Sequence, residues 1–503
     1  MKRIWFIMTL WAILAACEDK LDITPKGKTV LGGVDELETL LNQEYSLGSM
    51  TDLTIVCNES YGSFSSVVTT LTTPNTLAYA YLAYDESINR ALLTTTSDIY
   101  ENIYKYINYM NVVLNKIDDA EGDDFKKVRL TAEARVMRAY FHWLLVNIYA
   151  GQYDEATAET AGGIAYVTDL NVEKEKTKLS VAEVYRLILE DCSEENIAKL
   201  PDLAPDVCRA GKAWGYAVRA KVFMQMKKYP EALACALKSI EYKNILEDRS
   251  VILANSGAWN VERTDPNNLL FMNNHMIAPL GEILSIETAA LFEEGDYVRD
   301  YSDWMGGFDF GGDDDWDDEE YGDEEYSNGD DGDEEEIELP LDKNPQSVWN
   351  SPFGEMDSGI TGALEFYSFF VWENIWGITV DRMYYTAAEC YIRTGNIDKG
   401  LHLVDEVRRL RIHPENFTSF EGKATTEEEA MALMQPAKWI ECLGTYENYF
   451  DCKRWNSEPK YRRTITREIP GFGTYTLSPE SSLWVFPFPN NAVRYNPSLT
   501  QNY

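Results

Sequence analysis

The feature that most constrains the fold is a repeated helical periodicity in the apolar side chains. Between residues 100 and 117, large apolar residues recur at steps of three and four: Tyr100, Ile103, Tyr104, Ile107, Met110, Leu114 and Ile117. That spacing places them on one face of a helix. Residues 128–150 are apolar on more than one side, which indicates a more deeply buried helix. The pattern predicts a mainly α fold.

Two later helical segments share a second regularity. The series Ala220, Phe223, Tyr229, Ala232 and Ala236 recurs as Ala388, Tyr391, Ile397, Gly400 and Val404. Small residues at such positions let two antiparallel helices approach closely, as in tetratricopeptide repeats. Tyr140 to Ala156 carries a looser version. We interpret these segments as degenerate repeats within about 35–240 and 380–415; generic helical hairpins are the alternative.

Long stretches without helical period separate and follow these segments, at roughly 241–285, 296–375 and 456–503. Structureless loops of that length are uncommon in compact domains unless they carry a function or are disordered. We therefore predict a loop-rich region at about 241–375, with short strands packed on the helical scaffold, and a C-terminal segment at 430–503.

The N-terminus has the organisation of a secretory signal. Lys2 and Arg3 precede an apolar run of 13 residues, Ile4 to Ala16, too short for the roughly 20 residues of a spanning helix. The run ends in Leu14-Ala15-Ala16-Cys17, which looks like a bacterial lipobox. We predict that residues 1–16 are a signal peptide and that Cys17 carries acyl chains such as palmitate. An ordinary signal peptide or a buried N-terminal helix are the alternatives.

The net charge of −39 argues against nucleic-acid binding, which needs clustered basic residues. It also argues against electrostatic adhesion to anionic lipids, so lipid on Cys17 would hold the protein at the membrane. Seventeen acidic residues lie in the insertion 309–336, which has no Lys or Arg. We interpret this insertion as a solvated loop that the repulsion between its carboxylates keeps extended. A site for calcium or a cationic ligand is the alternative.

Residues for catalysis or metal binding form no recognisable motif. The sequence lacks His-Glu-x-x-His, Gly-x-Ser-x-Gly, Cys-x-x-Cys and a phosphate loop. The four histidines are scattered, and we expect His142 to be packed in a core helix. Seven cysteines remain besides Cys17, and we expect most to be small buried residues. The sequence thus predicts no enzyme, no cofactor and no metal site.

Several motifs, taken in order along the chain, resemble those of SusD/RagB-like lipoproteins. Cys17 is followed by Leu21-Asp22 and Pro25, like the mature start of the family. Further segments similar to family motifs are Glu133-Ala134-Arg135 with Met137-Arg138-Ala139, Asp381-Arg382 with Ala387-Ala388-Glu389, Arg408-Arg409-Leu410-Arg411, and Tyr449-Phe450-Asp451-Cys452-Lys453-Arg454-Trp455. The most specific are Phe486-Pro487-Phe488-Pro489 and the ending Asn496-Pro497-Ser498-Leu499-Thr500-Gln501-Asn502-Tyr503. Ala150 and the acidic insertion depart from the family pattern.

The resemblance implies about four tetratricopeptide-like helix pairs plus an irregular ligand-binding region, in one domain spanning 17–503. It also implies a lipid-anchored location on the surface of the outer membrane. The partner would be a SusC-like TonB-dependent transporter, to which the protein delivers an oligosaccharide or a peptide. A structural or adhesive surface lipoprotein without a transported ligand is the alternative.

Aromatic side chains in aperiodic, polar surroundings are the candidate ligand-binding residues. Aromatic faces stack on the C–H faces of sugars, while amides and carboxylates bind the hydroxyls. The candidates are Tyr61, Tyr84, Trp304, Trp316, Trp349 and Trp372. No motif fixes their positions, and ordinary packing is the alternative for each.

Overall fold

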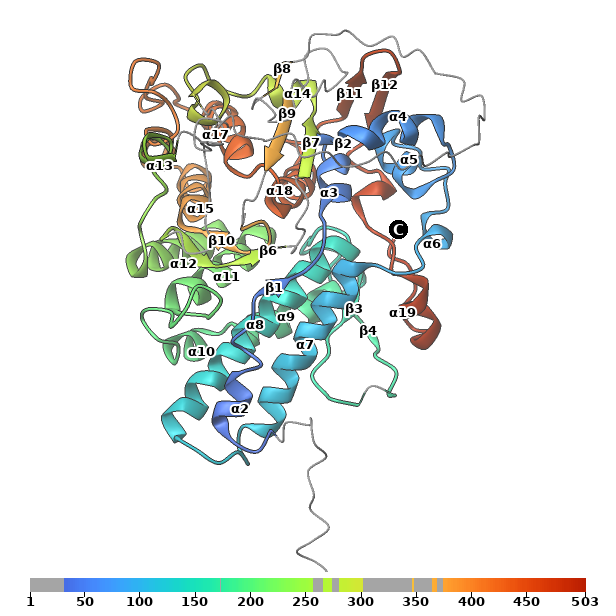
Figure 1. Ribbon diagram of the computed structural model, residues 1–503, viewed down its shortest axis with the longest axis vertical. Helices are drawn as coiled ribbons and strands as arrows, with labels where there is room; N and C mark the ends of the chain where they lie inside the picture. Colours follow the sequence, from blue (N-terminus) through green and yellow to red (C-terminus); the bar gives the residue numbers. More distant parts are fainter. Residues whose placement is uncertain are drawn as a thin grey trace, which may run out of the picture.

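The computed structural model describes residues 31–171, 173–256, 266–273, 280–301, 346–347, 364–368 and 374–503. Helices dominate these residues, and the strands among them are short (Figure 1). The prediction of a mainly α fold is confirmed. In the described part of the chain, no helix combines the length and the apolar character needed to cross a bilayer.

The helices divide into long pairs and short connecting turns. They are α2 (Val34–Glu38), α3 (Thr51–Val56), α4 (Phe64–Thr72), α5 (Leu77–Leu82), α6 (Arg90–Leu93), α7 (Asp98–Lys116), α8 (Asp124–Tyr149), α9 (Val181–Asp191), α10 (Glu194–Ala198), α11 (Lys212–Gln225), α12 (Tyr229–Tyr242), α13 (Arg249–Ser256), α14 (Ile286–Ala289), the π-helical turn η2 (Tyr297–Tyr301), α15 (Val380–Arg393), α16 (Ile397–Arg408), α17 (Glu427–Glu441), α18 (Tyr446–Asn456), the 3-10 turn η3 (Ser482–Trp484) and α19 (Asn490–Tyr495).

The strands form small separate sheets. They are β1 (Tyr45–Ser46), β2 (Ser60–Ser63), β3 (Gly162–Ala165), β4 (Lys178–Ser180), β5 (Asn268–Leu270), β6 (Met272–Asn273), β7 (Leu280–Leu284), β8 (Gln346–Ser347), β9 (Leu364–Ser368), β10 (Ile378–Thr379), β11 (Ile465–Ile469) and β12 (Gly473–Leu477). The largest sheet has the order β2-β7-β9-β8; β1-β6, β5-β10, β11-β12 and β3-β4 form pairs.

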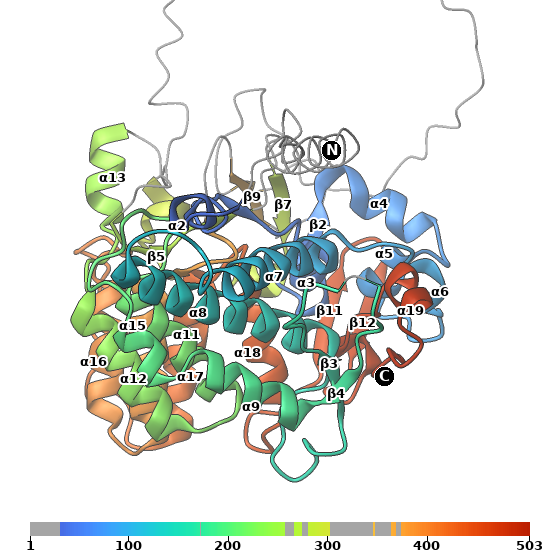
Figure 2. The same cartoon turned by 90° about the horizontal axis from the view of Figure 1, so that it is seen from below.

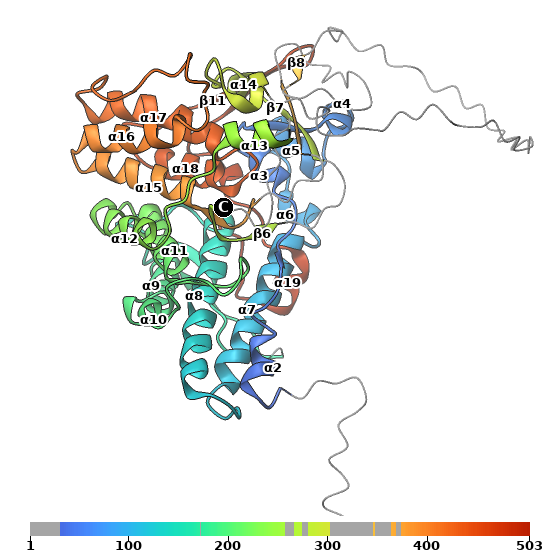
Figure 3. The same ribbon diagram turned by 60° about the vertical axis from the view of Figure 1, so that its left-hand side comes forward.

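The long helices stack as successive hairpins. α7 packs on α8, α8 on α9, α11 on α12, α12 on α15, and α15 on both α16 and α17. Figure 3 shows this progression from α2 and α7 at one end to α15, α16 and α17 at the other. Seen from below in Figure 2, α7 and α8 run side by side across the molecule. The stack is the architecture that the small-residue spacing predicted.

The contacts in the last repeat explain most directly why small residues recur at this spacing. A Cβ atom on Gly400 would lie 2.7 Å from the carbonyl oxygen of Ala388 and 2.6 Å from Cγ1 of Ile392. Only glycine lets α16 come this close to α15. In the segment that carries the looser version of the repeat, however, no helix follows directly on residue 151. The next helix that packs on α8 is α9, which begins at Val181 after a capping box on Ser180.

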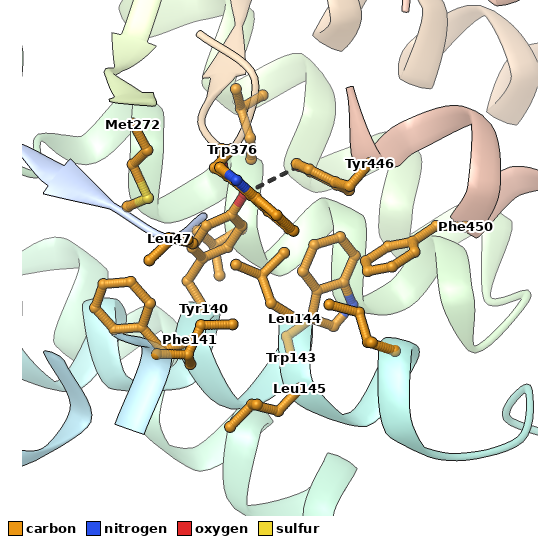
Figure 4. Packing of buried hydrophobic residues seen from close by; sticks show 14 of the residues in the cluster. Leu47, Tyr140, Phe141, Trp143, Leu144, Leu145, Met272, Trp376, Tyr446 and Phe450 are labelled. Carbon is orange, nitrogen blue, oxygen red and sulfur yellow. Dashed lines mark hydrogen bonds between the residues drawn. The ribbon is translucent and has the colours of Figure 1, made fainter. Parts of the chain in front are cut away.

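An aromatic cluster joins the first repeats to the C-terminal helices (Figure 4). The Tyr140 hydroxyl on α8 donates to the carbonyl oxygen of Trp376, just before β10, and lies 3.0 Å from the Tyr446 hydroxyl on α18. Because one hydroxyl carries one proton, Tyr446 is the donor in the second bond. Trp376 stacks on Tyr446, with ring centroids 6.0 Å apart. The cluster therefore links segments more than 200 residues apart in the sequence.

The C-terminal segment caps the end of α8, whose last carbonyl groups have no partner within the helix. The Asn502 side chain donates to the Tyr149 carbonyl at 2.8 Å. The Phe486 amide donates to the Ile148 carbonyl oxygen at 3.0 Å. Nζ of Lys453 lies 2.9 Å from the Ala150 carbonyl, and burial lowers the pKa of Lys453 to about 7. The C-terminal motifs therefore have a structural role.

Replacing Gly400 by Ala tests the close approach of α15 and α16. We expect G400A to lower the free energy of unfolding by about 1–3 kcal/mol, because the new methyl group has to displace a backbone carbonyl. The matched control is G151A, since a Cβ on Gly151 meets nothing within 4 Å. Urea unfolding measures both variants. Equal stability of G400A and G151A would contradict the packing argument.

Candidate functional site

A cavity with both polar and apolar walls lies where the loop-rich region meets the last helical repeat. Its volume is about 60 Å³, room for a small polar group or a few water molecules rather than a whole sugar ring. Side chains from and beside α13, β5, β10, η2, α15 and α17 surround it. The lining residues are Glu247, Arg249, Asn267, Asn268, Phe292, Val298, Asn374, Ile375, Thr379, Arg382, Ile440, Glu441, Leu443 and Thr445.

Two asparagines form much of the polar wall. The Asn374 side-chain amide donates to Asn268 Oδ1 at 2.8 Å and to the Leu270 carbonyl at 2.9 Å. Its Oδ1 accepts from the Met272 amide at 2.9 Å, so both ends of the side chain are engaged. The Asn267 amide donates to Oδ2 of Asp381 at 2.8 Å. Asn374 therefore supports the strand β5, and Asn267 ties it to α15.

Buried ion pairs hold the wall formed by α17 in place. The guanidinium of Arg411 donates to both carboxylate oxygens of Glu441, at 2.7 and 2.9 Å, and to Asp381 Oδ1 at 2.8 Å. Arg411 also donates to the Glu247 carbonyl at 2.6 Å. Arg249 donates to the Glu247 carboxylate at 2.8 Å. This cluster joins the start of α13 to α15 and α17.

The two carboxylates that bond Arg411 differ in acidity. Burial opposes the ionisation of Glu441, but Arg411 and Arg249 outweigh it and hold the pKa of Glu441 below its ordinary value. Burial raises the pKa of Asp381. The attraction of Arg411 opposes this rise, but the nearby carboxylates of Glu441 and Glu247 offset that attraction. The pairing with Arg411 is therefore what keeps Glu441 charged beside the cavity.

Arg382 forms the cationic side of the cavity. It donates to the carbonyl oxygens of Gly377 at 3.1 Å and Asn374 at 2.8 Å. These bonds hold the turn before β10 against the first turn of α15. Among the described residues, no carboxylate lies within ion-pair distance of this guanidinium.

Other motif residues form ion pairs within the scaffold. Arg454 of α18 donates to both carboxylate oxygens of Glu389, at 2.7 and 2.8 Å, and also pairs with Asp451. Similarly, Arg209 pairs with Glu133 at 2.7 Å. All these side chains are buried. Arg454 and its partners join α18 to α15, and Arg209 joins the segment before α11 to α8.

The structure places Tyr61 and Tyr84 in the interior, 1% and 7% exposed. The Tyr61 hydroxyl donates to the Glu468 carbonyl at 2.7 Å and accepts from the Ile286 amide. The Tyr84 hydroxyl donates to the Val56 carbonyl at 3.2 Å, and the Arg467 guanidinium lies 4.0 Å above its ring. The geometry supports the packing alternative for both residues; their role in ligand binding stays a prediction.

The remaining candidates, Cys17, Trp304, Trp316, Trp349 and Trp372, lie outside the described residues, as does the acidic insertion 309–336. The described cysteines from Cys57 to Cys452 are buried and free, as expected. His142 is buried and accepts from the Val167 amide at 3.0 Å. In the part of the chain that the structure describes, no group of acidic, His and Cys side chains has the arrangement of a metal site.

Sequence reasoning did not find the cavity residues Asn267, Arg249 and Glu441. Each is a common polar residue without a motif, and they come from segments far apart in the chain. Of the residues in and beside the cavity, only Asp381, Arg382 and Arg411 belong to motifs that resemble those of the family. The functional interest of the others appears only when the fold brings them together.

Comparison with known families agrees with the fold. A SusD-like family model, described as starch-binding and associating with the outer membrane, matches residues 32–224. The SusD/RagB family model matches residues 382–503. The chain belongs to the SusD/RagB-like family. A search among curated proteins found no match.

Solved SusD-like structures share the fold over nearly the whole chain. A SusD-like protein from Bacteroides fragilis is 16% identical, with a TM-score of 0.62 and coverage of 94% of this chain and 97% of its own. A SusD superfamily protein from Bacteroides thetaiotaomicron is 14% identical, with a TM-score of 0.59 and coverage of 94% and 100%. A SusD-like carbohydrate binding protein from Bacteroides vulgatus is 15% identical, with a TM-score of 0.58 and coverage of 94% and 98%.

Removing Arg411 tests whether the ion pairs hold this cavity together. We expect R411A to cost about 3–5 kcal/mol of stability, because it leaves Glu441 and Asp381 buried with fewer partners. The control is R409A, whose side chain is 49% exposed and lies 3.9 Å from Glu421; we expect less than about 0.5 kcal/mol. Thermal unfolding followed by circular dichroism compares the two. Similar losses would argue against a special role for Arg411.

Proposed function

We propose that the protein is a surface-exposed outer-membrane lipoprotein that binds an oligosaccharide and delivers it to a SusC-like TonB-dependent transporter. The mature chain, residues 17–503, would form one SusD/RagB-like domain. The proposal is a binding role rather than a catalytic one, in keeping with the lack of catalytic motifs in the sequence.

The observation that carries the ligand assignment is the polar cavity under the loop-rich region. Its amide, carboxylate and guanidinium groups can donate to and accept from hydroxyls, while Phe292, Ile440 and Leu443 supply apolar contact. Such a mixture is typical of sites for small polar ligands. Structural relatives described as carbohydrate binding support the choice of a saccharide over a peptide.

The position of the first described residues supports the anchored arrangement. The described chain begins beside the α7–α8 connection, where the Val34 amide donates to the Glu121 carbonyl at 2.9 Å. In Figure 1 this end of the molecule, marked by α2, lies opposite the sheet β2-β7-β9-β8. A lipid on Cys17 would therefore tether the end remote from that sheet and leave the loop-rich end accessible.

A saccharide screen tests the binding role. We expect the detergent-solubilised mature protein to bind at least one neutral oligosaccharide from a panel of malto-, xylo- and manno-oligosaccharides, measured by isothermal titration calorimetry. Matched peptides of mixed sequence serve as the second panel. Binding of peptides with no binding of saccharides would contradict the proposed ligand class, and binding of neither would favour the adhesive alternative.

Changing Cys17 to Ala tests the anchor. We expect cells labelled with radioactive palmitate to incorporate label into the wild type and into C57A, which alters a buried cysteine of the folded domain. C17A should carry no label and should leave the outer-membrane fraction, because a lipoprotein without acyl chains has no stable hold on the bilayer. Labelling of C17A at the wild-type level would refute the assignment.

A further inference from the structure

The first turn of α8 carries the most exposed large apolar side chain in the described part of the chain. Phe125 is 89% exposed, and Val128 on the same helix is 49% exposed. Residues three positions apart lie on one face of a helix, so the two side chains form a small apolar patch. Burial of such a ring against an apolar partner is favourable.

Hydrogen bonds and ion pairs hold this turn in place. The Asp123 carboxylate caps the helix by accepting from the Lys126 amide at 2.7 Å. The Lys126 ammonium in turn pairs with Asp35 and Glu38 of α2, each at 2.5 Å. The first turn of α8 is therefore fixed against α2, and with it the backbone that carries Phe125.

The chain that leads to the predicted anchor leaves from the same place. Leu31 is the first described residue, and the carbonyl of the next residue, Gly32, accepts from the Glu121 amide at 3.0 Å. Glu121 lies in the connection between α7 and α8, four positions before Phe125. Cys17 precedes Leu31 by fourteen positions, a stretch that spans at most about 50 Å when fully extended. The anchor is therefore attached beside the apolar patch, at the end of the molecule that α2 marks in Figure 1.

The charges beside the patch favour an apolar contact over an electrostatic one. Five exposed carboxylates lie in the connection that precedes the patch, and no Lys or Arg lies between 117 and 125; they are Asp118, Asp119, Glu121, Asp123 and Asp124. Anionic headgroups would repel them. A bilayer deforms around a projecting side chain, and aromatic rings favour its interface with water. A lipid surface with neutral headgroups is therefore the partner that fits the patch.

We propose that Phe125 and Val128 insert into the lipid surface to which Cys17 is anchored, as a second contact between the protein and the membrane. The inference rests on the lipid anchor of the proposed function and adds how the anchored protein is oriented. A tether alone leaves the domain free to rotate, whereas a contact at the start of α8 directs this end towards the bilayer. Because the anchor already confines the patch to the surface, a weak contact is enough.

A fluorescent label beside Phe125 tests the contact. The lipoprotein with the substitution D124C is labelled on the introduced thiol and reconstituted into vesicles of phosphatidylcholine and phosphatidylethanolamine whose acyl chains carry bromine, a quencher of fluorescence. The native cysteines other than Cys17 are buried, so the label reaches the new thiol. We expect brominated lipid to lower the emission at least about twofold, because an apolar helix face buries itself to the depth of the acyl boundary.

Two comparisons isolate the role of the ring. In D124C/F125S the label keeps its place but the ring is absent, and the quenching should fall to the level of the control. The matched control is L92C, because Leu92 is 73% exposed on α6, which Figure 1 places away from α2. Phosphatidylglycerol in the vesicles should weaken the quenching in D124C, since its headgroup repels the neighbouring carboxylates.

The outcomes separate this inference from the proposed function. If the protein floats with the vesicles but the label in D124C is quenched no more than in L92C, the membrane contact is wrong while the anchor stands. Equal quenching in D124C and D124C/F125S would also overturn the contact. If the label is not quenched in vesicles but is shielded from aqueous iodide in outer membranes, a protein partner covers the patch and the proposal is wrong. If the protein does not float with the vesicles, the anchor of the proposed function fails.

Discussion

The hydrogen bonds of the Arg411 guanidinium hold the loop-rich region to the helical scaffold. It satisfies Glu441 with two hydrogen bonds, Asp381 with one and the Glu247 carbonyl with a fourth. Burying so many charges is costly unless nearly every lone pair and proton finds a partner. Here most do, and Asp381 in turn orients Asn267. The geometry of the cavity therefore follows from the pairing beneath it.

The helical scaffold was largely predictable from the sequence because its signals are local. The spacing of Ala388, Gly400 and their neighbours identified the α15–α16 hairpin. The looser repeat misplaced the second helix of its pair. Nothing in residues 140–156 could reveal that the chain first forms β3 and β4 before returning to pack on α8.

The candidate site was much less predictable because its contacts span the chain. Asn267 and Asp381 are 114 positions apart, and Arg411, in the loop after α16, pairs with Glu441 of α17. Aromatic residues in polar surroundings were the signal available in the sequence, and the structure shows that Tyr61 and Tyr84 pack in the interior and bond backbone carbonyls. The role of the C-terminal motifs, in contrast, is explained by the hydrogen bonds that they make to the carbonyl groups at the end of α8. The family matches cover 32–224 and 382–503, leaving Asn267 and Asn374 in the segment between them.

Hydrogen–deuterium exchange on the wild-type protein, with and without the neutral saccharide that binds it, tests the central claim most directly. If the cavity is the binding subsite, backbone amides around 247–249, 267–273, 374–382 and 440–445 should exchange more slowly in the presence of the sugar. Amides of α7 and α9, remote from the cavity, should be unaffected. Slower exchange confined to those remote helices, with none around the cavity, would contradict the account.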